Sequence, residues 1–76
     1  MKLSNEKFEQ VIGSDLERDG MYLEITDVGN SADAYLKIFY SDITHKFSLT
    51  LFKEGIDLEL IEEAIEIAKH RLVPIS

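Results

Sequence analysis

The chain has 76 residues, of which 15 are Asp or Glu and 8 are Lys or Arg, and it contains no Cys. At this length we expect one domain over residues 1–76, and its stability must come from burial because no disulfide can form. A net charge of −7 argues against direct contact with nucleic acid or anionic membranes, and the lack of a long apolar stretch favours a cytoplasmic protein.

The N-terminal segment has the spacing of a helix. Its apolar residues follow one another at intervals of three and four: Phe8, Val11, Ile12 and Leu16. Ser4 suits the N-cap position, and Leu3 before it is placed to pack on Phe8. We therefore expect a helix from Ser4 to about Arg18, with Gly13 as an alternative, earlier end.

From Met21 onwards the apolar period changes to two, which is typical of strands. Three segments alternate in this way: 21–26, 34–40 and 43–51. Turn-forming residues separate them, at Gly29 to Ser31 and at Ser41 and Asp42. We therefore expect a three-stranded antiparallel meander.

Two-residue loops at Asn30-Ser31 and Ser41-Asp42 would set the register of this meander. The first loop places Ile25 opposite Leu36 and Leu23 opposite Ile38. The second places Phe47 opposite Leu36 and His45 opposite Ile38. The inward face is then apolar along its length and carries Leu23, Ile25, Leu36, Ile38, Phe47 and Leu49.

A second helix is predicted from Asp57, as N-cap, to about Leu72, which precedes Pro74. Its apolar residues fill about half of the helical circumference, which is more than one sheet contact needs. We expect both helices to pack on the apolar face of the sheet. The predicted fold class is thus α+β, with the order α-β-β-β-α.

This element order resembles that of the double-stranded RNA-binding domain. That family holds phosphates with lysines at the start of its second helix, whereas residues 57–63 of this chain read DLELIEE. The charge is opposite in sign, so the resemblance extends to element order only and RNA binding is not expected. The order also resembles the first part of acidic type III secretion chaperones, which bind partner proteins.

Catalytic and metal-binding patterns are not apparent in the sequence. The two histidines, His45 and His70, fall on different elements, and Glu66 with His70 is only one i, i+4 pair. No serine lies in a nucleophile elbow, and the glycines are scattered singly. We therefore expect no enzyme activity, no catalytic residue, no cofactor and no bound metal.

Two surfaces are candidates for contact with a partner. One is the outer sheet face, where Tyr22, Tyr35 and Phe39 would surround Lys37, and where exposed aromatic residues suggest an interface. The other is the acidic face of the second helix, formed by Glu59, Glu62, Glu63 and Glu66. Both have a simpler interpretation as ordinary solvated surface.

The sequence therefore favours a small, acidic, non-enzymatic protein-binding module of the inhibitor, immunity, antitoxin or phage-antagonist type. Its expected partner is a protein, and a basic one would suit the acidic helix. One alternative is a structural module that forms homodimers, and another is a small oligomeric enzyme.

Overall fold

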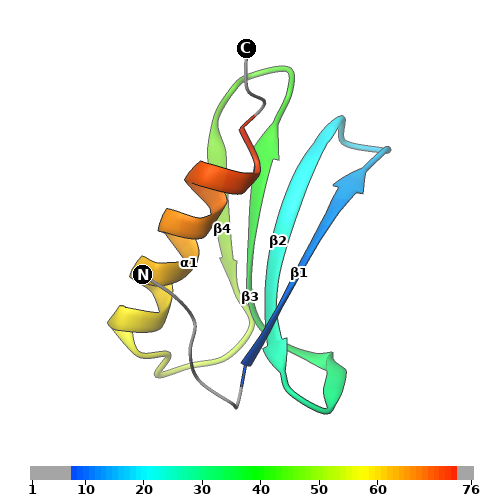
Figure 1. Ribbon diagram of the computed structural model, residues 1–76. Helices are drawn as coiled ribbons and strands as arrows, with labels where there is room; N and C mark the ends of the chain where they lie inside the picture. The colour runs from blue at the N-terminus through cyan, green and yellow to red at the C-terminus, as the bar shows by residue number, and fades with distance from the viewer. Residues whose placement is uncertain (1–7, 74–76) are drawn as a thin grey trace.

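The computed structural model describes residues 8–73, apart from the side chain of Ser31. Four strands form one antiparallel sheet in chain order, and a single helix follows them (Figure 1). The elements are β1 (Phe8–Asp15), β2 (Gly20–Asp27), β3 (Asn30–Ser41), β4 (Phe47–Leu51) and α1 (Leu58–Arg71). The fold is α+β with the order β-β-β-β-α, so the predicted α-β-β-β-α order is wrong.

The error lies in the first segment, where residues 8–15 form β1 instead of a helix. Phe8 and Ile12 are four residues apart, a spacing that puts two side chains on one face of a helix and equally on one face of a strand. Pairing with β2 decides between the two, since Phe8 and Ile12 pack against the core while Val11 lies opposite Glu24. Leu16 is 87% exposed in the following turn. The predicted cap at Ser4 and its neighbour Leu3 lie outside the described residues.

The predicted register between β2 and β3 is confirmed in the middle of the sheet. Leu23 pairs with Ile38 and Ile25 with Leu36, as the alternation indicates. The turn itself differs, because the strands are joined at Val28-Gly29 and the register shifts on either side of Thr26. The irregular residues beside the turn absorb the difference, which is the usual effect of a β-bulge.

The predicted register between β3 and β4 is wrong by four residues. Leu36 lies opposite Leu51, and Ile38 lies opposite Leu49. The connecting loop spans residues 42–46, and the Ser41 side chain accepts hydrogen bonds from the amides of residues 43 and 44. His45, predicted to lie on the inner strand face, is an exposed loop residue with φ of 60°. Because the shift is even, the side chains of β4 still face the predicted sides.

Helix α1 begins and ends within a residue of the predicted bounds. Asp57 occupies the N-cap position, where its backbone carbonyl, and not its side chain, accepts hydrogen bonds from the amides of residues 60 and 61. The helix packs on β2 and β3. The core between these layers consists of buried residues from both: Leu23, Ile25, Leu36, Ile38, Tyr40, Leu60, Ala64, Ala68 and Leu72.

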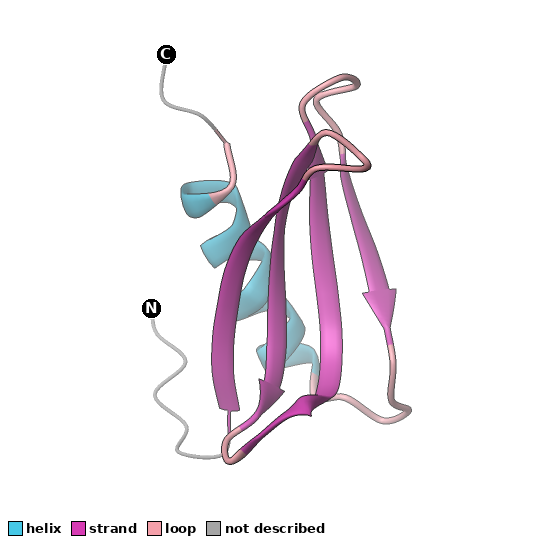
Figure 2. Ribbon diagram, turned by 90° about the vertical axis from the view of Figure 1, so that its right-hand side faces the viewer, coloured by secondary structure: helices cyan, strands magenta, loops and turns pink. Residues whose placement is uncertain are grey.

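One helix is too narrow to cover a four-stranded sheet, because a helix about 10 Å wide spans roughly two strands at 4.8 Å spacing. In Figure 2 the helix lies behind β1 and β2, while β4 stands clear of it at the opposite edge. Phe47 and Leu49, which were expected in the core beneath a second helix, are therefore exposed. The inner side of β4 is the uncovered part of the sheet.

Candidate functional site

Strand β4 is an edge of the sheet, and its backbone orientation follows from two hydrogen bonds. The Ser41 amide donates to the Lys46 carbonyl, and the Phe52 amide donates to the Tyr35 carbonyl. Antiparallel strands alternate residues that face the neighbour with residues that face away. The backbone groups of Ser48 and Thr50 therefore face β3. Those of Phe47, Leu49 and Leu51 face outward, where no described residue pairs with them.

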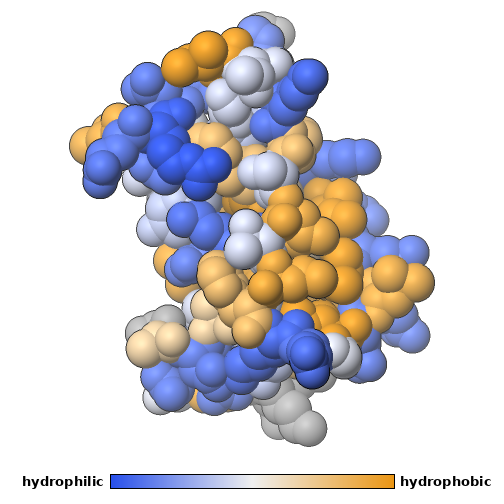
Figure 3. Space-filling model, turned by 180° about the vertical axis from the view of Figure 1, so that it is seen from behind, coloured by the Kyte–Doolittle hydropathy of each residue, from blue (hydrophilic) through white to orange (hydrophobic). Residues whose placement is uncertain are grey.

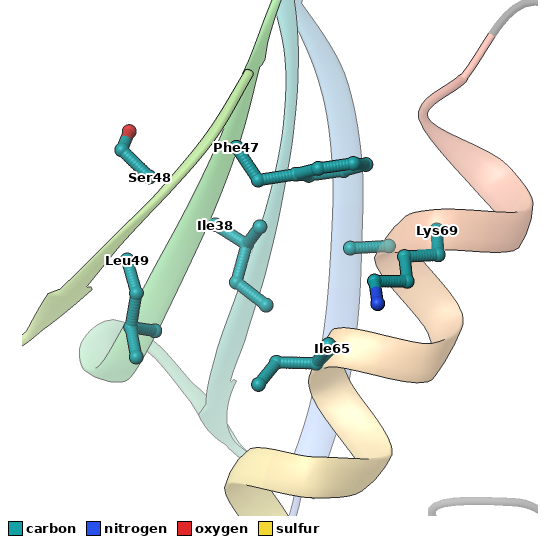
Figure 4. A pocket seen from close by; sticks show the side chains of 7 residues that line it. Ile38, Phe47, Ser48, Leu49, Ile65 and Lys69 are labelled. Carbon is teal, nitrogen blue, oxygen red and sulfur yellow. The ribbon is translucent and has the colours of Figure 1, made fainter.

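The same three residues direct apolar side chains toward the helix side of the sheet. Phe47, Leu49 and Ile65 border a hollow of about 160 Å³ whose floor is Ile38 (Figure 4). A second hollow, of about 530 Å³, lies at the end of the same strand, between the loop that follows β4 and the first turn of α1. We call the two together the β4–α1 groove. Its apolar lining consists of Ile38, Phe47, Leu49, Leu51, Phe52, Ile56, Ile61, Ile65 and Ala68.

The groove belongs to a continuous apolar surface. Five of its side chains are 37–53% exposed: Phe47, Leu49, Leu51, Phe52 and Ile65. Figure 3 shows a large hydrophobic area in the centre of the view from behind. At roughly 200 Å² for a residue of this size, the five expose about 450 Å². The largest patch on a typical monomer is of this order and is often functional.

Charged groups lie at the ends and along one side of this surface. Lys69 lines the first hollow, and Lys53 with Glu54 lines the second. Around the helix from Ile65, the next charged positions away from the sheet are Lys69 and then Glu62, both exposed, whereas Glu66 lies on the side opposite the sheet. The strand side differs, because residues 46–53 contain two lysines and no acid. The groove is thus apolar in its centre, with Lys69 at its helical rim and Lys53 and Glu54 at one end.

Lys53 anchors the end of β4 to the start of β3. Its Nζ lies 2.8 Å from Oδ2 of Asp33 and 4.1 Å from the ring centroid of Tyr35. Tyr35 also meets Phe8 edge to face, with ring centroids 5.0 Å apart. These contacts place Tyr35 near the start of α1, where it lines a third hollow with Phe8 and Leu60, next to the second hollow. Tyr35 is therefore not part of the outer aromatic group in which it was expected.

The hydrogen bond to Asp33 raises the pKa of Lys53, with smaller favourable contributions from nearby charges. A raised pKa in the folded state means that the ammonium form stabilises the fold below the unfolded pKa of 10.5. We therefore expect this stabilisation to disappear as the pH rises through the raised value. Thermal unfolding of the wild type and of Asp33→Asn can be compared between about pH 8 and 11.5. The wild type should unfold at the higher temperature, and its advantage over Asp33→Asn should shrink above pH 10.5. If the two curves of unfolding temperature against pH ran parallel, the hydrogen bond to Asp33 would not be the cause of the raised Lys53 pKa. Tyrosine ionisation affects both proteins equally and cannot produce a difference between them.

The outer sheet face brings together three of the predicted residues. Tyr22 and Phe39 are cross-strand partners, and Lys37 Nζ lies 4.9 Å from the Tyr22 ring centroid. Phe39, however, is only 6% exposed, because the Arg18 guanidinium lies 3.9 Å above its ring and Gly20 lies beside it. The expectation that Phe39 offers an open aromatic surface is wrong. Residues of this chain already cover it.

The acidic residues of α1 lie where the periodicity predicts. Glu59, Glu62 and Glu66 are exposed, and Glu63 is half-buried. All four lie away from the buried helix positions Leu60, Ala64 and Ala68. They form a charged surface beside the groove, and nothing in the structure shows what it contacts.

The groove was missed because two helices were expected to cover the sheet face that carries Phe47 and Leu49, and only one is present. The wide apolar arc of the C-terminal helix was the available signal, since it exceeded the need of one sheet contact. The predicted excess edge was Leu60 and Ile67, but Leu60 is buried in the core and Ile67 packs against it. The helix residues that border the groove on the side of β4 are Ile61 and Ile65. An apolar arc without an apolar partner in the same chain points to an external contact.

Among residues 8–73, no helix has the length and apolar character needed to cross a membrane. Within the same part of the chain, no three His, Cys, Asp or Glu side chains are grouped to hold a metal ion. Comparison of the chain with protein-family models, with curated proteins and with solved structures gives no match.

Proposed function

We propose that this protein is a non-enzymatic protein-binding module that accepts an extended polypeptide segment along β4. The observation that carries the proposal is the coincidence of two unsatisfied features on one strand. Phe47, Leu49 and Leu51 have outward backbone groups and also line an apolar groove. A strand added at this edge would pair with the outward backbone groups and would cover the apolar side chains in the same binding event.

The edge is open to such an addition. Natural proteins protect exposed edge strands with charged or proline residues, which make pairing unfavourable. The other edge, β1, carries Glu9 and Asp15, whereas β4 has the uncharged sequence FSLTL. Nothing within β4 opposes pairing with another strand, except its short length.

Specificity would come from the side chains beside the backbone ladder. Every second residue of an added strand would point into the β4–α1 groove, where Leu49 and Ile65 face each other across the first hollow (Figure 4). Apolar residues at those positions would fill the groove. The net charge of −7 and the exposed glutamates on the outer side of α1 would favour a partner that carries basic residues outside the paired strand.

A peptide library tests this function. Random peptides selected on the immobilised protein should show alternating apolar residues, and they should lose at least ten-fold in affinity for Leu49→Glu. The reason is that peptide binding would take a carboxylate out of water into an apolar groove, a cost that the exposed Lys69 at its rim offsets only in part. Isothermal titration calorimetry with individual selected peptides measures the loss.

Thr50→Glu is the matched control. It adds the same charge on the neighbouring residue, but Thr50 points to the opposite face and its backbone groups face β3. Peptide affinity should stay within about three-fold of the wild type. Peptides that bind all three proteins equally would show that the β4–α1 groove is not the binding site.

A further inference from the structure

We infer that the strand that pairs with β4 is β4 of a second copy, so that the chain forms a two-fold symmetric dimer. This inference rests on the proposed function, because both need a β4 edge that accepts a strand. The inference adds the identity of the partner to the proposed function. Its evidence is the sequence and the geometry of β4.

The strand is self-complementary in the antiparallel direction. Its centre is Leu49, and pairing Leu49 with Leu49 of the second copy places Phe47 opposite Leu51. These are the residues whose backbone groups face outward, so every outward N–H and C=O of the strand finds a partner. A shift by two residues in either direction leaves one of them unpaired. The centred register is therefore the one that satisfies the whole edge.

The two-fold axis runs perpendicular to the sheet in this arrangement, so both α1 helices lie on the same face. The apolar side chains of the two β4 strands then adjoin one another between the two helices. On the opposite face, Ser48 lies across from Thr50 of the second copy, which is an uncharged polar pair. Each copy provides the kind of strand that the proposed function requires of a partner.

Charges at the junction permit this contact although each copy carries −7. Residues 46–53 contain no acid, and the two lysines lie at opposite ends. In the centred register Lys46 comes opposite Phe52, so no lysine faces another lysine across the junction. The repulsion between the two copies therefore comes from charges that lie away from the junction. Salt screens interactions between such charges over about 10 Å.

The arrangement also explains how association stops at two copies. The remaining edge, β1, carries the exposed Glu9 and the partly exposed Asp15, which disfavour pairing there. A contact between identical strands is closed, whereas pairing of β4 with β1 of the next copy would continue into a fibre. Complete coverage of the five apolar side chains would bury about 450 Å² of their surface per copy, below the ~800 Å² of a standard interface, so the dimer should dissociate on dilution.

Sedimentation velocity of the full chain from about 1 µM to about 1 mM tests the inference. The wild type should move from 8.7 kDa to twice that mass within this range. Leu49→Glu places two carboxylates at the axis and should weaken the dimer at least 100-fold. The dissociation constant of the Thr50→Glu dimer should stay within about three-fold of that of the wild type. Circular dichroism checks that both variants fold, which is expected because both side chains are exposed.

Salt distinguishes a second copy from a basic partner. Dimerisation of two acidic chains should tighten about three-fold or more between 50 and 500 mM salt, whereas binding of a basic peptide should weaken. A wild type that stays monomeric at 1 mM overturns the inference, and so does a Leu49→Glu variant that still dimerises. Library peptides that bind a monomeric wild type and fail on Leu49→Glu would leave the proposed function standing without the dimer.

Discussion

Gly20→Ala should unfold the protein or destabilise it by about 3 kcal/mol or more. A Cβ atom built at Gly20 would lie 2.5 Å from Cζ of Phe39, and it would lie closer still to the backbone carbonyl oxygen of Tyr40. Gly20 pairs with Ser41 at the end of the β2–β3 ladder, so the carbonyl of Tyr40 cannot withdraw unless the two strands separate. Chemical denaturation followed by circular dichroism measures the loss.

Gly13→Ala is the control for this prediction. A Cβ atom there would meet the far end of the Tyr22 side chain, 2.7 Å from its hydroxyl oxygen. An exposed tyrosine end can rotate away, so we expect a loss of about 1 kcal/mol or less. If the two alanine variants lost equal stability, the clash at Gly20 would not be with the backbone.

Leu36→Ala should cost about 2–5 kcal/mol, which is a large part of the stability of so small a domain. Leu36 is fully buried, at 0% exposure, beneath α1 on a central strand. Truncation removes apolar contacts and leaves a cavity that the two packed layers cannot fully close. Urea or thermal unfolding provides the measurement.

Leu51→Ala makes the same chemical change on the cross-strand partner of Leu36. Leu51 is 50% exposed because the helix does not reach β4, so its truncation should cost less than about 1 kcal/mol at concentrations where the chain is monomeric. Equal losses at the two positions would show that β4 is covered as fully as β3. That result would remove the groove, and with it the proposed function.

The two faces of the sheet differ in how completely the chain covers them. On the outer face, Arg18 and Gly20 cover Phe39, and Lys37 lies over Tyr22. On the inner face, α1 covers β2 and β3 and leaves the side chains of β4 partly exposed. Exposed aromatics were expected on the outer face, yet the larger apolar surface is on the inner one. A partner strand that adds to β4 would cover the side chains of β4 that α1 leaves exposed.

Local pattern alone determined the parts of the fold that depend on neighbouring residues. The bounds of α1 followed from Asp57 before its apolar stripe and Pro74 beyond it, because helix ends depend on the residues that flank them. The central register of β2 and β3 followed from alternation, since a slip by one residue would turn Leu23 and Ile25 away from the core. The position of the α1 glutamates away from the core also followed from local pattern, because helical periodicity alone places them there.

Tertiary structure decided the features that depend on distant partners. Residues 8–15 suit a helix or a strand by spacing, and pairing with β2 made them a strand. The β3–β4 register depends on a five-residue loop, which the side chains of Ser41 and Thr44 shape by accepting three hydrogen bonds from loop amides. Coverage of Phe39 by Arg18 needs two turns to meet in space, and Asp42 donates a hydrogen bond to the Asp19 carbonyl there. The strand form of residues 8–15 and the coverage of Phe39 are set by contacts between segments, which a one-dimensional pattern does not contain. The β3–β4 register is set by the conformation of the loop, which apolar alternation does not reveal.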